Sequence, residues 1–249
     1  MRTLLFANRI TKEVLRDPIN LAFGLGFPLA LLVLLSAVNA NIPPEADNPM
    51  FAIGNLAPGM AMFGSVFMAL FVGMIVAKDR TSSFLTRLFT SPMTASDFLV
   101  GYAVPMVVMA LAQSAITLLA ACFFGLSLSI TILPAICVAG ITSALFIGIG
   151  LLTGSLMNDK AVGGICGALL TNVAGWLSGI FIPISLIGGA FETITMALPF
   201  YHSVEAIRHV LAGEYADIMS HLAIVLGYTA IIFVLAIGAF RRKMSSGTP

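Results

Sequence analysis

The chain has 249 residues, of which 59% are hydrophobic and only 9% are charged, and its formal net charge is +1. A soluble domain has about 25% charged residues, so this composition excludes a water-soluble globular protein. The stretch from Phe98 to Asn158 contains no Asp, Glu, Lys or Arg. As a helix it would be roughly 90 Å long, against a hydrocarbon core of about 30 Å, so it must cross a membrane twice.

The first predicted element is an amphipathic helix over residues 2–16, with charged side chains on one face and apolar side chains on the other. Only Leu5 falls on the wrong side. Such a helix lies in the membrane interface before the chain turns at Asp17-Pro18, where it would serve either as a generic membrane anchor or, as we expect, as an elbow helix that orients the first span. The residues of its apolar face are Leu4, Phe6, Ala7, Ile10, Val14 and Leu15.

Six apolar runs follow, and each is long enough to cross a bilayer as a helix. Their continuous apolarity favours helices over the alternating strands of a membrane barrel. The predicted fold is therefore an all-α membrane protein with a single domain over residues 1–249. The six predicted spans cover residues 19–39, 56–77, 98–123, 131–157, 161–182 and 222–240.

The basic residues predict the orientation of the chain in the membrane. With six spans both termini lie on one side, and every Lys and Arg except Arg208 falls on that side. Because basic loops stay cytoplasmic, we expect a multi-pass protein of the plasma membrane with cytoplasmic N- and C-termini. Contact with the anionic lipid bilayer accounts for the bases beside the spans, and the net charge of +1 gives no indication of a nucleic-acid partner.

A charged passage over residues 78–97 separates the second and third spans. It contains a predicted short helix that ends at Ser91-Pro92, with Arg87 off its apolar face. Thr94 and Asp97 resemble a capping box that opens the third span. Since this chain has no groove-bearing domain, the apolar face predicts a cytoplasmic coupling helix that docks on a partner. That face comprises Phe84, Leu85, Leu88 and Phe89.

Glycines gather in the fourth and fifth spans as three GxxxG pairs. Each pair places two glycines on one helix face, where helix backbones can approach closely. The pairs predict tightly packed helices. They are Gly150 and Gly154, Gly163 and Gly167, and Gly175 and Gly179.

Residues 183–221 are too long and too apolar for a simple external loop. Two short helices are predicted at 191–198 and 204–211, separated by Pro199 and ended by Gly213. They are too short to span a bilayer, so we expect external re-entrant helices that shape an exit. Glu205 and Arg208 share one face of the second helix. They are interpreted equally as an ordinary ion pair or as a latch on the external helices.

The sequence offers little chemistry. It has no phosphate-binding G-x-x-x-x-G-K-[ST] motif, no acid or base inside a predicted span, and no metal-ligand spacing among its cysteines. We therefore expect no nucleotide hydrolysis, proton relay, catalytic residue or metal site in this chain. An intramembrane serine protease is the remaining enzymatic alternative, and ordinary helix packing of the serine is favoured over it. Its dyad would pair Ser178 with His202, His209 or His221.

Three regions resemble the membrane subunits of ABC-2 type ABC exporters, and the similarity covers essentially the whole chain. They are the elbow helix ending in Leu15-Arg-Asp-Pro18, the loop from Lys78 to Met93 with its Ser-Pro turn, and the outer segment from Ser178 to Gly213. The sequence departs from the family pattern at three places. Asp79 replaces the usual Glu, Ser82-Ser83 replaces Gly-Thr, and a proline is missing near Ile187–Ala190.

The resemblance implies a permease subunit that moves an amphipathic, drug-like or lipid-linked substrate outward. Separate ABC ATP-binding subunits would bind ATP and Mg, this chain would bind no cofactor, and a second permease copy or a homologue would complete the pore. A non-transporting membrane anchor of an ATPase remains an alternative. The coupling residues that the resemblance implies are Asp79, Arg80, Phe84, Leu85, Arg87, Leu88 and Phe89.

Overall fold

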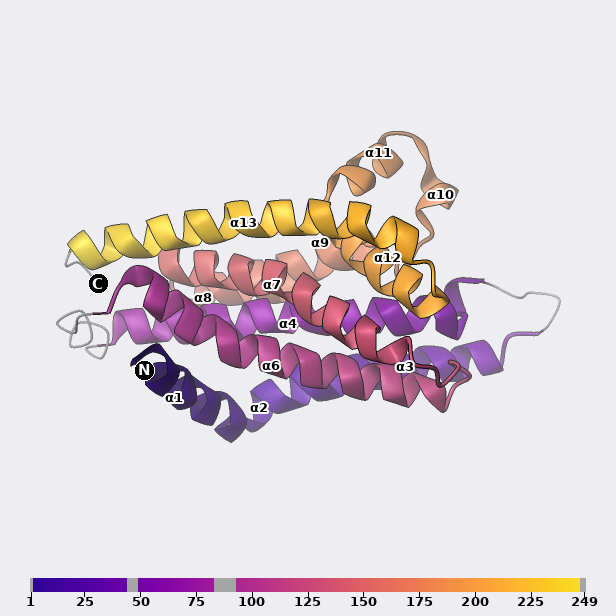
Figure 1. The fold of residues 1–249 in the computed structure, drawn as a ribbon, viewed down its shortest axis with the longest axis horizontal. Helices are drawn as coiled ribbons and strands as arrows, with labels where there is room; N and C mark the ends of the chain where they lie inside the picture. The colour runs from indigo at the N-terminus through magenta and orange to yellow at the C-terminus, as the bar shows by residue number, and fades with distance from the viewer. Residues whose placement is uncertain (1, 44–48, 83–92, 247–249) are drawn as a thin grey trace.

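The computed structural model describes residues 2–43, 49–82 and 93–246, and within them every regular element is a helix (Figure 1). The predicted all-α class is therefore confirmed. The long helices run side by side, and the start of α1 and the end of α13 lie at the same end of the bundle (Figure 1). The apolar coupling-helix residues Phe84, Leu85, Leu88 and Phe89, together with Arg87, lie outside the described residues.

Five helices in the described part of the chain are long and apolar enough to cross a membrane. The first span joins α2 (Pro18–Leu21), the π-helical turn η1 (Ala22–Gly26) and α3 (Phe27–Ala40). The other four are α4 (Ile53–Thr81), α6 (Ala95–Cys122), α7 (Ile132–Leu156) and α13 (Tyr215–Ser246). The short helix η3 (Pro49–Phe51) precedes α4.

The predicted fifth span, 161–182, does not appear as one long helix. It is built from α8 (Asp159–Val162), the π-helical segment η4 (Gly163–Leu169) and α9 (Leu170–Trp176), so the helix ends six residues before Ile182. Glycine weakens a helix, and Gly179 takes a left-handed backbone conformation with φ of +75°, which turns the chain. The count of six spans thus depends on accepting this shorter, interrupted helix.

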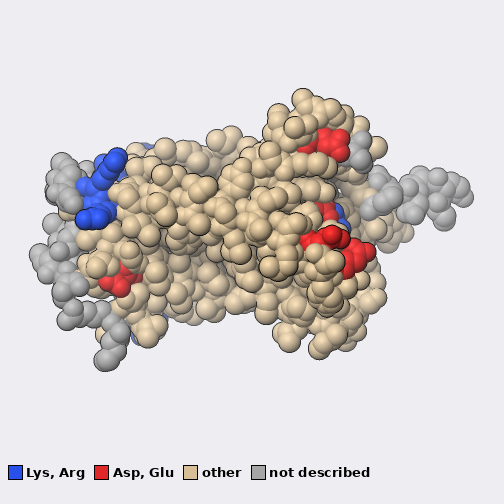
Figure 2. Space-filling model, turned by 45° about the horizontal axis from the view of Figure 1, so that its top comes forward, with Lys and Arg blue, Asp and Glu red and all other residues tan. Residues whose placement is uncertain are grey.

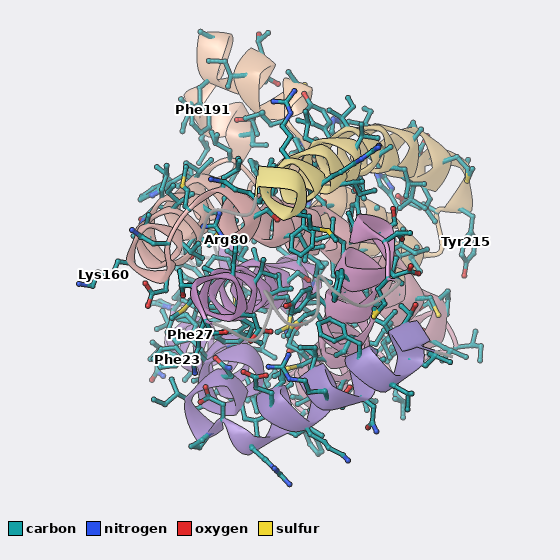
Figure 3. All side chains as sticks on the ribbon, turned by 90° about the vertical axis from the view of Figure 1, so that its left-hand side faces the viewer. Phe23, Phe27, Arg80, Lys160, Phe191 and Tyr215 are labelled. Carbon is teal, nitrogen blue, oxygen red and sulfur yellow. The ribbon has the colours of Figure 1, made fainter. Side chains whose placement is uncertain are left out.

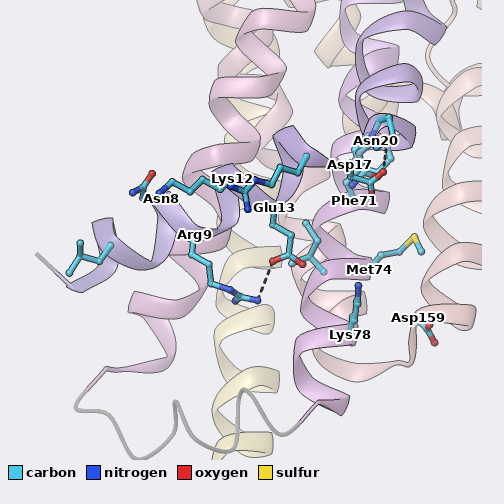
Figure 4. A pocket seen from close by; sticks show the side chains of 14 residues that line it. Asn8, Arg9, Lys12, Glu13, Asp17, Asn20, Phe71, Met74, Lys78 and Asp159 are labelled. Atoms are coloured by element: carbon cyan, nitrogen blue, oxygen red, sulfur yellow. Dashed lines mark hydrogen bonds and ion pairs between the residues drawn. The ribbon is translucent and has the colours of Figure 1, made fainter.

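The N-terminal amphipathic helix is present as α1 (Arg2–Arg16), which runs at an angle to the long helices (Figures 1 and 4). Its buried side packs on α6, where the Phe6 ring meets Phe98 and Tyr102 edge to face at 5.4 and 4.9 Å. Leu4 and Leu15 are exposed instead, because only part of the predicted apolar face turns toward the bundle. The side chains it buries are Phe6, Ala7, Ile10 and Val14.

Helix α4 is the centre of the bundle and contacts α7, α6, α3 and α12. Its closest neighbour is α7. A Cβ on Gly150 would lie 2.2 Å from the carbonyl oxygen of Ala69, and one on Gly154 would lie 2.4 Å from that of Gly73. The two glycines therefore let the backbones of α4 and α7 touch. Gly163 has nothing within 4 Å of such a Cβ, and Gly167 and Gly175 have only side chains there.

The segment before α13 forms α10 (Ile184–Ile187), α11 (Gly189–Ala197) and α12 (Pro199–Ala212), at the bundle end opposite the termini (Figure 1). The predicted start of the second short helix at Val204 is wrong by five residues. Pro199 occupies the first helical turn, where its missing N–H costs nothing, and so it begins α12 rather than separating two helices. Gly213 ends α12 with φ of +79°, as predicted.

The charged side chains follow this arrangement. On the face shown in Figure 2 they gather toward the two ends of the molecule, and a broad uncharged band lies between them. This pattern, together with the five apolar helices, is that of a membrane protein.

Candidate functional site

The first candidate site surrounds the two points where the 83–92 segment joins the bundle. The structure corrects the sequence prediction here, because α4 continues to Thr81 rather than ending near residue 77. Lys78, Asp79 and Arg80 therefore belong to the last helical turn and not to a loop. Basic residues are favoured in that position, where the helix dipole is negative.

Asp79 is buried, with 5% of its surface exposed, and it is held by two other helices. Arg9 of α1 donates two hydrogen bonds to its carboxylate oxygens, at 2.9 and 3.0 Å. The Tyr102 hydroxyl of α6 donates a third, at 2.8 Å to Oδ2. Such a fork-shaped arginine–carboxylate pair is directional and strong, so α1, α4 and α6 are joined at one carboxylate. We call Arg9, Asp79 and Tyr102 the inner clamp.

Arg80 points to a different neighbour. Its guanidinium donates to the carbonyl oxygens of Ser155, at 2.6 Å, and Met157, at 2.8 Å, at the end of α7. These carbonyls have no partner within their own helix, so Arg80 caps α7. In Figure 3 Arg80 lies among the helices, whereas Lys160 points away from them. Two adjacent residues of α4 therefore fasten three other helices.

The far side of the 83–92 segment is also tied to α1. The Thr94 hydroxyl accepts from the Asp97 N–H at 3.2 Å, and the Thr94 N–H donates to Asp97 Oδ2 at 2.9 Å, which confirms the predicted capping box. The Thr3 hydroxyl donates to the other carboxylate oxygen of Asp97 at 3.1 Å. The helices on both sides of the predicted coupling element are thus bonded to α1.

A cleft of about 870 Å³ opens beside the inner clamp, between α1 and α4 (Figure 4). Arg9 and Glu13 of α1 face Lys78 and Met74 of α4 across it. Burial disfavours the charged form of Arg9, but its hydrogen bonds to Asp79 and the charge of that carboxylate outweigh this effect and raise its pKa. The remaining lining side chains are Leu5, Asn8, Lys12, Arg16, Asp17, Pro18, Asn20, Phe71, Ile75 and Asp159.

The second candidate site lies at the opposite end. Glu205, with 7% of its surface exposed, pairs with Arg208, and Arg208 also donates to the side-chain oxygen of Asn55 near the start of α4. We call these three residues the outer clamp. Beside it is a cavity of about 420 Å³ lined also by Glu192, Tyr201 and others. Burial and then the Glu205 charge raise the pKa of Tyr201, so its hydroxyl stays neutral.

The protease alternative finds no dyad in the described residues. Ser178 is fully buried and its hydroxyl donates to the Gly175 carbonyl oxygen at 3.2 Å. The three histidines bond elsewhere. His202 and His221 bond to each other, and His209 bonds to Glu214. Among the residues described, no group of three His, Cys, Asp or Glu could hold a metal ion.

Sequence reasoning placed Asp79 and Arg80 in the coupling region but missed their partners. Arg9 and Asp79 are 70 positions apart, and Tyr102 lies within an apolar run. The only sequence signal was that a few charges survive in a chain that has few. It likewise missed the histidine contacts, although all three histidines fall within the predicted external region, residues 183–221.

Comparison with known proteins gives consistent matches over most of the chain. The family model described as ABC-2 type transporter matches residues 2–212. Nodulation protein J of Rhizobium leguminosarum bv. viciae is 25% identical over 234 residues, covering 92% of this chain and 86% of that protein. Nodulation protein J of Bradyrhizobium diazoefficiens is 28% identical over 235 residues, covering 92% of this chain and 85% of the relative.

Proposed function

Because the chain belongs to the ABC-2 type transporter membrane family, we propose that it is the permease subunit of an ATP-driven exporter. It would move an amphipathic, drug-like or lipid-linked substrate outward across the plasma membrane, with both termini in the cytoplasm. A separate ABC ATP-binding subunit would bind ATP and Mg and perform the hydrolysis. The observation that carries this proposal is the inner clamp, which stands where the predicted coupling element joins the bundle.

The inner clamp and Arg80 bond the end of α4, where the coupling element begins, to the neighbouring helices. A displacement of residues 83–92 would act on the last turn of α4, which is bonded to α1 and α6 through Asp79 and to α7 through Arg80. On the other side, Asp97 ties the start of α6 to Thr3 of α1. Closely packed elements move as units rather than deform, so such a push would shift several helices together.

The exposed surfaces of the bundle leave room for the other proposed contacts. Most of the first span and of α13 is exposed, in contrast to the largely buried α4. In a membrane these apolar faces would meet lipid or a second permease copy or homologue. The apolar spans favour an amphipathic cargo over a polar ion, which would require polar groups along its path.

Copurification tests the proposal. The chain would be produced together with an ATP-binding subunit, and Phe84→Asp/Phe89→Asp would be compared with wild type. We expect the double variant to lose the ATPase while still inserting into the membrane. The matched control is Leu128→Asp/Ile130→Asp, which changes two exposed apolar residues between α6 and α7 at the other end of the molecule and should retain the ATPase.

Two further measurements separate the alternatives. The chain purified alone should show no ATP hydrolysis, and measurable turnover would contradict the proposal. The complex, reconstituted in inverted vesicles, should accumulate an amphipathic dye only with ATP. A stable complex that hydrolyses ATP without moving any amphiphile offered would indicate a membrane anchor for an ATPase instead.

A further inference from the structure

We propose that His202 and His221 form a proton-binding site that holds α12 against α13 at neutral pH and releases it when the outer side becomes acidic. The two Nδ1 atoms lie 2.7 Å apart, and His202 Nε2 lies 2.8 Å from the carbonyl oxygen of Met196 on α11. The site goes beyond the proposed transport function, and only its exposure to the outer side rests on the orientation proposed above.

The hydrogen bonds fix the tautomers of the neutral pair. A carbonyl oxygen only accepts, so His202 Nε2 must carry a hydrogen and donate to Met196. In a neutral ring the other nitrogen is then an acceptor, so His221 Nδ1 must donate to His202 Nδ1. His202 is mostly buried, at 8% exposure, and both of its nitrogens are used.

Several titratable groups lie around this pair, whereas α7, which packs on both α12 and α13, has no Asp, Glu, Lys, Arg or His. On α12, His209 stacks on His221 at 5.3 Å and bonds to Glu214, which precedes α13. Glu205 is engaged by Arg208, and like Asp217 it acts on His221 only through its charge. The nearest carboxylate oxygens thus serve His209 and Arg208 rather than the pair. The Tyr201 ring of α12 lies 5.5 Å from the His202 ring and 6.3 Å from the His221 ring, and Glu192 of α11 and the neutral Asn55 of α4 line the adjoining cavity.

The hydrogen bonds also determine which ring nitrogen can take each added proton. A first proton fits on His221 Nε2, because its Nδ1 can continue to donate to His202. A second would have to go to His202 Nδ1, where two N–H groups would face each other at 2.7 Å. The separated rings can each take a proton, so the open arrangement binds more protons than the closed one. Once the first proton is bound, a further fall in pH therefore favours opening, by up to about tenfold per pH unit for the one extra proton.

Opening of the histidine pair would change the cavity beside the outer clamp, which we call the outer cavity. Met196 on α11 and Tyr201, Glu205 and Arg208 on α12 line that cavity, and Met196 also accepts from His202. Tyr228 of α13 adds one more link, since its hydroxyl donates to the Ala197 carbonyl oxygen at 3.0 Å. Loss of the histidine pair would thus loosen two helices that form one wall of the cavity.

Nuclear magnetic resonance of the full chain, labelled with ¹⁵N in its histidine rings and held in lipid nanodiscs, tests the site directly. The chain has only three histidines, so single substitutions assign the signals. At about pH 8 we expect His202 as the Nε2–H tautomer and His221 as the Nδ1–H tautomer. On acidification the pair should take up protons in two steps separated by more than about one pH unit. Independent single-step titrations, with neutral His221 in the Nε2–H form, would overturn the proposal.

A distance measurement tests the movement. Spin labels at Ile194 of α11 and Val234 of α13, both exposed, would be introduced into a chain without its three native cysteines. The distance should lengthen between about pH 8 and about pH 5.5. His221→Gln keeps a donor for His202 but cannot be protonated, and should abolish the change. His209→Gln, outside the pair, should keep it. A change that persists in His221→Gln, or disappears equally in both variants, would refute the mechanism.

Discussion

Replacing Asp79 by alanine should release α1 from the bundle. The substitution removes the acceptor of three hydrogen bonds and leaves the Arg9 charge without its main partner. Breaking a buried ion pair on one side costs about 3–5 kcal/mol. The Arg9 side chain is 35% exposed and keeps Glu13 at 3.1 Å, which reduces its share of that cost. Leaving the Tyr102 hydroxyl without its hydrogen-bond acceptor adds about 1–3 kcal/mol. We therefore expect the free energy of unfolding to fall by about 3 kcal/mol in total.

Two readouts measure this loss. Unfolding in mixed micelles gives the change in free energy. A cysteine at Ile10, which is fully buried on the bundle-facing side of α1, should react with a maleimide only when α1 lifts away. The matched control is Glu13→Gln, which removes the exposed partner of Arg9 and should cost less than about 1 kcal/mol.

Replacing the whole inner clamp separates geometry from charge. Arg9→Met, Asp79→Leu and Tyr102→Phe together leave no buried polar group of the clamp without a partner, and apolar replacements of a buried ion pair are often neutral. The triple variant should therefore be more stable than Asp79→Ala alone. If Asp79→Ala stays within about 0.5 kcal/mol of wild type, or if the three changes simply add, the clamp is not the structural unit described here.

Three other predictions concern separate parts of the molecule. Gly150→Ala should cost about 1–3 kcal/mol in the same unfolding measurement, because its Cβ meets the Ala69 carbonyl oxygen, whereas Gly163→Ala has open space and should be neutral or stabilising. Arg208→Gln should destabilise the chain more than Asn55→Ala, since it strands the buried Glu205 carboxylate, and equal effects would contradict the outer clamp. Because the pKa of Arg9 is raised above its ordinary value, its contribution to stability is complete below that ordinary value and is lost only as the pH rises beyond the raised one, so maleimide labelling of the Ile10 cysteine, measured relative to an exposed cysteine, should not increase between about pH 7 and about pH 10.

Local patterns carried the successful sequence predictions. The α1 helix follows from its charged and apolar faces, and the capping box follows from two residues three positions apart. Gly213 ends α12 because it accepts a left-handed conformation. Each of these features depends on neighbours within about one helical turn, which a sequence displays directly.

The features that could not be predicted from the sequence depend instead on residues far apart in the chain. The burial of Asp79 depends on Arg9, 70 positions away, and the histidine pair joins residues 19 positions apart. The C-terminal ends of α4 and α9 also could not be predicted from where the apolar runs end. Paired charges let α4 extend past its apolar run, whereas a π-helical segment and a turn at Gly179 shorten the helix after α8. Tertiary partners decide how deep a charge can lie, and composition alone does not reveal them.

The two clamps together explain why α4 is suited to carry motion along the molecule. Asp79 fastens its inner end to α1 and α6, and Arg208 reaches from α12 to Asn55 near its outer end. Between them α4 is largely buried, and the glycines of α7 bring the two helix backbones into contact. A closely packed helix transmits displacement better than a flexible segment would. We infer that a push at residues 83–92 reaches the outer cavity through α4, so that its outer partner α12 is the element that the histidine pair restrains.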